Sequence, residues 1–146
     1  MDRYIDATEK AVNEFYLDFI KKGNIVMLNL LKYKPKADYG NLEPINSQKE
    51  ITGKEAYELY IDTIKEELVE NKSHIIFKGE CNNFLIGPES EKWDELLLVE
   101  HQSVRSFREF SQSTAYLNNV LYRTAGLEDS RVLPSTEPHL THCKSE

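Results

Sequence analysis

The run from Asn24 to Tyr33 is the feature that most constrains the fold of this chain. Nearly all of its residues are apolar and suited to a β-strand, and one uncharged polar residue, Asn29, stands in its middle. A strand this apolar has to be covered on both faces, so it belongs at the centre of an α/β or α+β domain. Asn29 must then find hydrogen-bond partners in the interior or in a pocket.

Composition and charge exclude several classes of protein. The length of 146 residues predicts one domain, residues 1–146, with a sizeable core. The net charge of −7 and the lack of a basic stripe with interleaved aromatic residues argue against nucleic-acid binding. The apolar runs are too short to span a membrane, and the acidic N-terminus is unlike a secretory signal. Two distant cysteines without a CxxC spacing, Cys81 and Cys143, therefore favour a reduced, cytoplasmic protein.

The first half of the chain predicts two helices on either side of the apolar strand. Apolar residues at helical spacing predict the first helix over residues 8–22. A polar connection over residues 34–51 follows the strand and is long enough for a lid or a mobile loop. Thr52 and Glu55 have the spacing of a capping box, which begins a second helix that continues to about Asn71.

The second half predicts a hairpin, a divided helical region and a last strand. Strong turn residues between its first two strands indicate that these strands form the hairpin. The polar tail, residues 135–146, is expected to be mobile. The expected elements are strands over 74–85 and 93–101, helices that begin at Ser103 and after Ser113, and a strand over 127–133.

The order of these elements predicts a fold class and an assembly. After the extra N-terminal helix, the order β-α-β-β-α-β is the ferredoxin-like α+β pattern, an antiparallel sheet with helices on one face. The other face of the sheet would be bare in a monomer. The strands offer enough apolar surface for both faces, through residues such as Leu28, Leu30, Leu96 and Leu98. We therefore expect a two-fold homodimer in which two sheets pack together as a dimeric α/β barrel.

Five segments carry a resemblance to a known family. They are VMLNLLKY at 26–33, TGKEAY at 52–57, LIGPE at 85–89, WDE at 93–95 and LEDSR at 127–131. In this order they resemble a family of small bacterial proteins, known as a domain of unknown function, in the dimeric α/β-barrel superfamily. That superfamily includes ABM-type cofactor-independent monooxygenases, muconolactone isomerase, haem-degrading oxygenases, dye-decolourising haem peroxidases and ligand-binding modules. The resemblance implies the fold and leaves the reaction open.

The resemblance also points to particular residues. The family's serine, tyrosine and arginine correspond to Ser113, Tyr116 and Arg123. A glutamate near the end of the third strand corresponds to Glu100. The chain departs from the family at His101, where the smaller members tend to have an aromatic residue.

Tyr116 and Arg123 lie seven residues apart, so they share one face of a helix. Two interpretations are open. In the functional one, Arg123 pairs with a ligand carboxylate and Tyr116 donates a hydrogen bond to the ligand. In the structural one, which is the commoner arrangement, Arg123 pairs with Glu100 or Glu128 and holds the helix against the sheet.

Asn29 and Arg131 are polar residues in apolar strands. Asn29 could orient a ligand carbonyl or enolate oxygen, or it could bond a backbone group or Arg131. A buried arginine needs a partner, and Glu128, Asp129 or Asn29 could supply it.

Aromatic residues suggest the walls of a pocket. Trp93 and His101 have even spacing, so they are expected on one strand face. His101 could act as a base near neutral pH, or it could lie at a strand end on the surface, which is the commoner arrangement. Tyr57 and Tyr60 are expected to face the core with their hydroxyls at a pocket rim, where one could donate a proton.

No cofactor and no metal site is predicted. His139, His142 and Cys143 are close in sequence, but they lie on the tail and do not complete a four-ligand zinc site. A Gly-rich phosphate loop, which a nucleotide would need, is absent from the sequence. Haem has no supporting motif.

These observations lead to one functional hypothesis and one alternative. The hypothesis is a protein that binds a small organic molecule and that, if catalytic, is a cofactor-independent oxygenase or isomerase of a small enol or phenol-like metabolite. The catalytic candidates are His101 and Tyr57. The binding candidates are Asn29, Tyr60, Trp93, Glu100, Ser113, Tyr116, Arg123 and Arg131. The alternative is a non-catalytic module that binds a metabolite or a protein.

Overall fold

The computed structural model describes residues 2–40 and 50–138. Their order of elements is the one that the sequence predicts, including the extra first helix and the division of the last helical region. The expectations for His139, His142 and Cys143, for most of the tail and for residues 41–49 of the long connection lie outside the described residues. The elements are α1 (Glu9–Phe19), β1 (Ile25–Tyr33), α2 (Gly53–Glu70), β2 (Ser73–Glu80), β3 (Glu95–His101), α3 (Val104–Ser111), α4 (Thr114–Gly126) and β4 (Leu127–Ser135).

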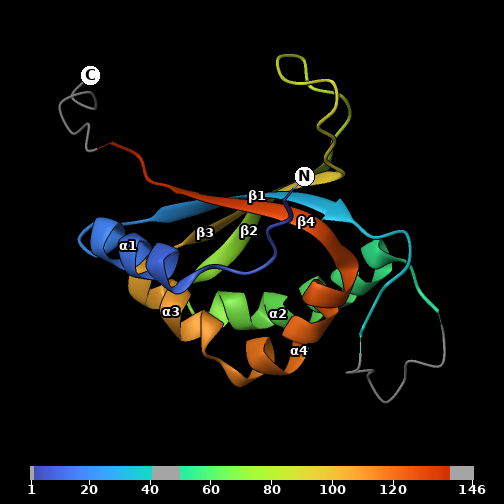
Figure 1. Cartoon of the computed structure of the whole chain (residues 1–146). Coiled ribbons are helices and arrows are strands. Elements are labelled where there is room, and N and C mark those ends of the chain that lie inside the picture. The colour runs from blue at the N-terminus through green and yellow to red at the C-terminus, as the bar shows by residue number, and fades with distance from the viewer. Residues whose placement is uncertain (1, 41–49, 139–146) are drawn as a thin grey trace.

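The four strands form one antiparallel sheet in the order β2-β3-β1-β4. The apolar strand β1 is therefore central, as its composition predicts, while β2 and β4 are the edges. All four helices lie on one side of the sheet, and the other side carries no helix (Figure 1). This is a ferredoxin-like α+β arrangement.

Alternation along the two central strands defines two faces of the sheet. The face toward the helices, called the core face here, holds buried residues such as Ile25, Leu31 and Leu97. Asn29 lies on this face and pairs with Leu97 of β3 and Val132 of β4. The opposite face, called the outer face, takes the residues in between, which are half-buried.

Side-chain caps fix where the helices begin. Thr52 and Glu55 form the expected capping box at the start of α2: the Thr52 hydroxyl accepts from the backbone N–H of Glu55 at 3.0 Å, and the Glu55 carboxylate accepts from that of Thr52 at 2.8 Å. Thr8, Ser103 and Ser113 cap the other three helices through one bond each, in which the hydroxyl accepts from a backbone N–H three residues on. Short polar motifs therefore encode all four starts.

Four boundaries differ from the expected ones. Helix α1 ends at Phe19 rather than near residue 22. Strand β2 ends at Glu80 and β3 begins at Glu95, because the residues between them form a long loop, the 81–94 loop. Strand β4 continues through Pro134, which an edge strand tolerates because one side of it has no partner.

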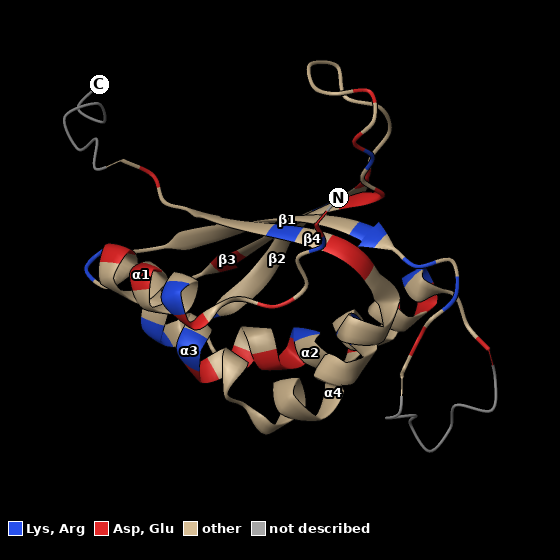
Figure 2. Ribbon diagram, viewed as in Figure 1, with Lys and Arg blue, Asp and Glu red and all other residues tan. Residues whose placement is uncertain are grey.

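Charged residues of both signs are interspersed on α1, α2 and α3 (Figure 2). Helix α4 differs, because Arg123 is its single charged residue. None of the helices in the described part of the chain is long and apolar enough to cross a membrane.

Candidate functional site

A cavity of about 580 Å³ lies between the core face of the sheet and the helices. Its size is within the range of small-molecule sites in proteins. Most of its wall is apolar. The apolar residues that line it include Met27, Ile64, Leu68, Val99, Phe107 and Phe110.

Residues 4–8, called the N-terminal segment here, form part of the cavity wall beside β4. Three hydrogen bonds hold this segment in place. The backbone N–H of Tyr4 donates to Asp129 Oδ1 at 2.9 Å, and the Ser130 hydroxyl donates to the carbonyl oxygen of Tyr4 at 2.5 Å. Arg123 Nη1 donates to the carbonyl oxygen of Ile5 at 2.9 Å. The first residues of the chain thus join its last strand and last helix at the site.

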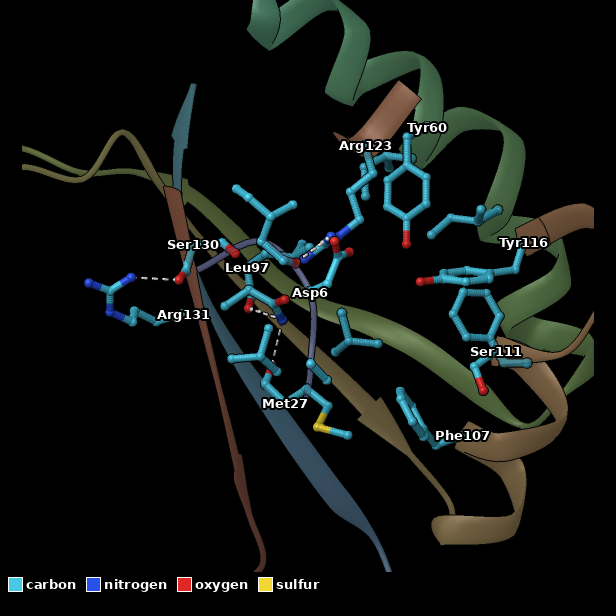
Figure 3. A pocket seen from close by; sticks show the side chains of 18 of the residues that line it. Asp6, Met27, Tyr60, Leu97, Phe107, Ser111, Tyr116, Arg123, Ser130 and Arg131 are labelled. Atoms are coloured by element: carbon cyan, nitrogen blue, oxygen red, sulfur yellow. Dashed lines mark hydrogen bonds between the residues drawn. The ribbon is translucent and has the colours of Figure 1, made fainter. Parts of the chain in front are cut away.

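Three tyrosines from two helices meet at one end of the cavity. The ring centroids of Tyr57 and Tyr60 are 5.3 Å apart, and those of Tyr60 and Tyr116 are 6.2 Å apart. The hydroxyls of Tyr60 and Tyr116 point toward the same space, and Arg123 reaches that space from α4 (Figure 3). Tyr57, Tyr60, Tyr116 and Arg123 all line the cavity, as expected for a binding site.

Burial raises the pKa values of these three hydroxyls still further above neutral pH. Burial is the largest cause that raises the pKa of Tyr57, to about 12, while the positive charge of Arg123 acts in the opposite direction. The pKa values of Tyr60 and Tyr116 are raised by the same dominant cause. At neutral pH the tyrosines are therefore neutral hydrogen-bond donors.

Asn29 presents its amide to the cavity from the middle of β1. Its Nδ2 donates to the carbonyl oxygens of Met27 at 3.1 Å and Leu97 at 3.2 Å. The interpretation that Asn29 bonds neighbouring backbone is therefore confirmed, and its pairing with Arg131 is not observed. With both amide donors directed at the sheet, Oδ1 remains as an acceptor for a ligand.

His101 lies in the interior, so its expected position at a surface strand end is wrong. It is 2% exposed, its Nδ1 lies 2.7 Å from the Ser73 hydroxyl oxygen, and its ring contacts Phe107 and Phe110. Burial lowers its pKa to about 4. The imidazole is therefore neutral at physiological pH, where it borders the cavity.

Trp93, expected on an aromatic wall with His101, does not line the cavity, whereas Arg131 does. Trp93 precedes β3, so it does not share a strand face with His101. The centroid of its ring lies 5.0 Å from the guanidinium carbon of Arg131. Arg131 borders the cavity from β4, but it pairs with Leu30 in the sheet, so its guanidinium is directed toward the outer face (Figure 3). Of the partners considered for Arg131, Asp129 is the one observed, at 2.6 Å.

Glu100 and Ser113 also lie away from the cavity. Glu100 is on the outer face, where Asn24 donates to it at 3.1 Å and His74 lies 3.4 Å away. Ser113 caps α4: its hydroxyl accepts from the backbone N–H of Tyr116 and donates to the carbonyl oxygen of Phe110. Both side chains have structural partners.

Arg123 has neither of the carboxylate partners that the structural interpretation offered. Glu100 faces the opposite side of the sheet, and Glu128 pairs with Arg3 at 3.8 Å. In the described part of the chain no carboxylate oxygen lies within 4.0 Å of its guanidinium nitrogens. Its observed acceptor is the backbone oxygen of Ile5.

Sequence reasoning missed a buried ionic group beside the site. Glu95 is 4% exposed, accepts a short hydrogen bond from the Tyr33 hydroxyl and pairs with Lys78 at 3.2 Å. The Tyr33 ring contacts that of Tyr57, 5.6 Å away. Alternation could have found this group, because Glu95 shares a strand face with the core residue Leu97.

Among residues 2–40 and 50–138, no group of three His, Cys, Asp or Glu side chains is arranged to hold a metal ion. The wall of the candidate site is mostly apolar and carries an arginine, three phenols, an amide and a neutral imidazole.

Comparisons with known proteins reveal one close group of relatives. No protein-family model matches the chain, and no curated protein matches it. A dabb family protein with a ferredoxin-like fold from Mesorhizobium loti is similar in structure, with a TM-score of 0.50 at 11% identity over 80% of this chain and 99% of that chain. This likeness supports the ferredoxin-like fold alone.

Two crystal structures of RPA0582 are much more similar. The methylated form matches with a TM-score of 0.83 at 30% identity, over 97% of this chain and 99% of its own. A second structure, of RPA0582 as a protein of unknown function from Rhodopseudomonas palustris, matches with a TM-score of 0.81 at 30% identity, over 94% of this chain and 100% of its own. At this identity over nearly the whole length, the chain belongs to the same family of ferredoxin-like proteins as RPA0582.

Proposed function

We propose that this protein binds a small organic molecule in the cavity between the sheet and the helices. The observation that carries the proposal is a mostly apolar cavity whose wall also carries Arg123, Asn29 and the tyrosines Tyr57, Tyr60 and Tyr116. Ligand sites commonly combine an apolar lining with a few convergent polar groups that fix orientation. Close-packed interiors, by contrast, contain few voids larger than a water molecule.

The test is binding of a neutral apolar dye, N-phenyl-1-naphthylamine, followed by fluorescence. We expect saturable binding of one dye per chain. Ala11 lines the cavity from α1, so Ala11→Phe should narrow it and weaken binding, whereas Lys10→Phe, one residue away and outside the lining, should not. Absence of saturable binding, or equal binding by all three proteins, would contradict the proposal.

A second candidate function is proton transfer to or from a bound enol or phenol-like molecule, as in a cofactor-independent oxygenase or isomerase. It is favoured by one observation, that His101 and Tyr57 both border the cavity. In this proposal Tyr57 donates a proton and His101 accepts one. It ranks below simple binding because a pKa of about 4 makes His101 a weak base at neutral pH.

This second candidate is tested with an enolisable aryl methyl ketone in D2O. The protein should accelerate deuterium incorporation at the methyl carbon, and His101→Gln and Tyr57→Phe should each abolish the acceleration. Incorporation at the rate of protein-free buffer would leave binding alone as the function.

We also propose that the outer face of the sheet packs against a second copy of this chain. The apolar side chains of this face include Val26, Leu28, Leu30, Leu96 and Leu98, and the helices cover only the other face (Figure 1). Four strands of seven to nine residues have a footprint of roughly 500 Å², whereas a standard interface buries about 800 Å² per partner. Further contacts are therefore needed.

The 81–94 loop supplies an apolar surface for those contacts. It stands on the outer side of the sheet (Figure 1), and its Leu85 and Ile86 are 99% and 90% exposed. A homodimer would bury both surfaces together. Light scattering is expected to show that the wild-type protein is a dimer and that Leu28→Glu is a monomer. The control Leu17→Glu changes an exposed residue of α1 and should remain a dimer. A monomeric wild type would contradict this assembly.

A further inference from the structure

The single charged residue of helix α4, Arg123, lies at the cavity. Arg123 lines the cavity, and one of its five N–H donors is used by the carbonyl oxygen of Ile5. Three other arginines, Arg3, Arg105 and Arg131, each lie within 4.0 Å of a carboxylate. Arg123 has no such partner among the described residues. A half-buried cation with most of its donors free is suited to an anion that enters the cavity.

The tyrosines extend this polar end. The hydroxyls of Tyr60 and Tyr116 point to the space beside the guanidinium (Figure 3), and their raised pKa values keep them protonated. Neutral hydroxyls next to a guanidinium donate charge-assisted hydrogen bonds to an anionic oxygen. A group with two oxygens could accept from Arg123 and a tyrosine at once.

The rest of the cavity is suited to an apolar body. Met27 and Phe107 lie on the wall away from Arg123 and Tyr60 (Figure 3). Phe110 and the neutral His101 continue this wall. The cavity thus has one polar end, with Arg123, Asp6 and the tyrosine hydroxyls, and one uncharged, aromatic and aliphatic part.

We propose that the ligand is an amphipathic monocarboxylate whose carboxylate binds Arg123, Tyr60 and Tyr116 and whose apolar body lies along the Met27 and Phe107 wall. This inference deepens the proposed binding function and rests on it. The charge of the head group follows from the charges at the cavity. Of the two arginines that line the cavity, Arg123 is directed inward and Arg131 away from it, and no lysine among the described residues lines the cavity. Asp6 borders the same end as Arg123. A dianion such as a phosphate would lack a second cation and would be repelled by Asp6.

The test compares dodecanoate with dodecan-1-ol, a neutral molecule with a chain of the same length, by calorimetry on the full chain. We expect wild type to prefer the acid by about tenfold or more, since hydrogen bonds to charged groups contribute on that scale. Arg123→Met should remove most of this preference for the acid and should still bind the alcohol. Asp6→Asn should strengthen binding of the acid, because it removes a like charge near the head group. The control Arg105→Met changes an exposed arginine and should leave the preference intact.

The outcomes separate this inference from the proposed function. Binding of the acid and alcohol with equal affinity, or a preference that survives in Arg123→Met, would overturn the carboxylate assignment and leave the cavity as a binding site. The carboxylate assignment would also be overturned if neither dodecanoate nor dodecan-1-ol binds while N-phenyl-1-naphthylamine does. Failure of all three molecules would overturn the proposed function itself. If Arg123→Met does not fold, Tyr116→Phe with Tyr60→Phe provides the second test and should lower the acid preference severalfold.

Discussion

The guanidinium of Arg123 donates a hydrogen bond to the carbonyl oxygen of Ile5, which is 118 positions away in the sequence. This contact joins the last helix to the N-terminal segment at the wall of the cavity. The same side chain thus has a structural role through one donor and presents its other donors to the cavity. The structural role of Arg123 is therefore observed, with an acceptor that the sequence did not suggest, and its role in binding a ligand stays a prediction.

Ser130→Ala is expected to loosen the N-terminal segment. The Ser130 hydroxyl donates to the carbonyl oxygen of Tyr4, and a net hydrogen bond of this kind contributes about 0.5–1.5 kcal/mol. The backbone N–H of Tyr4, which donates to Asp129, should therefore exchange with solvent about two- to tenfold faster. Hydrogen exchange measures this. Ser111→Ala, whose hydroxyl bonds a carbonyl oxygen within its own helix, should leave the Tyr4 amide unchanged; equal acceleration in both variants would sink the idea.

Gly53→Ala is expected to destabilise the protein, although alanine usually favours a helix over glycine. A β-carbon on Gly53 would lie 2.6 Å from the carbonyl oxygen of Gly126 and closer still to that of Lys34. Both neighbours are backbone atoms, so the free energy of unfolding should fall by about 1–3 kcal/mol. Urea denaturation checks this. The matched control is Gly23→Ala, where nothing lies within 4 Å of the added carbon, and it should change stability by less than about 0.5 kcal/mol.

The elements of the fold could be predicted from sequence because their signals are local. The capping box at Thr52 and Glu55 spans four residues, and the alternation of β1 is complete within one strand. Helix starts, strand order along the chain and the core-facing tyrosines all follow from patterns of this length.

The residues that the sequence misplaced depend on pairing between distant segments. The side of the sheet that Arg131 takes is fixed by its register with Leu30, which no local pattern contains. In sequence, Trp93 fits the alternating pattern of the residues in β3. In the structure, however, β3 begins at Glu95, and the backbone N–H of Asp94 donates to the carbonyl oxygen of Leu31 just before it. Trp93 therefore lies beyond the strand, where the alternation rule no longer applies.

Lys78→Met is expected to destabilise the protein through the carboxylate that it leaves behind. Glu95 is buried and pairs with Lys78 at 3.2 Å, so the substitution removes a cation from beside a buried charge. Because Lys78 is partly exposed, we expect a loss of about 1–3 kcal/mol, less than for a fully buried pair. Chemical denaturation checks this against Lys54→Met. Lys54 pairs with Glu80 at 3.6 Å on the surface and should contribute less than about 0.5 kcal/mol; similar losses in both variants would contradict the buried-charge argument.

Stability is expected to fall between pH 6.5 and pH 4 because of His101. Its pKa is about 4 in the folded protein, where burial disfavours the charged form, and about 6.5 in an unfolded chain. Between these values the unfolded chain binds a proton that the folded protein does not, so the free energy of unfolding decreases as the pH is lowered, by on the order of 3 kcal/mol over the whole window. The contribution is fully present above pH 6.5. The pKa of Asp129 is lowered in the folded protein, so protonation of Asp129 reduces stability only at pH values below this window.

Denaturation at pH 7.5 and pH 5 measures this effect of His101. His101→Gln should be less stable than wild type at pH 7.5, because it alters the contact with Ser73, but it should lose less stability on going to pH 5. His74→Gln is the control, because His74 is exposed on the outer face and leaves His101 in place, so this variant should retain the loss of stability that comes from His101. If His101→Gln lost as much stability as wild type on going to pH 5, the acid sensitivity would have to come from other groups, and His101 would not be the neutral, buried imidazole that the cavity wall requires.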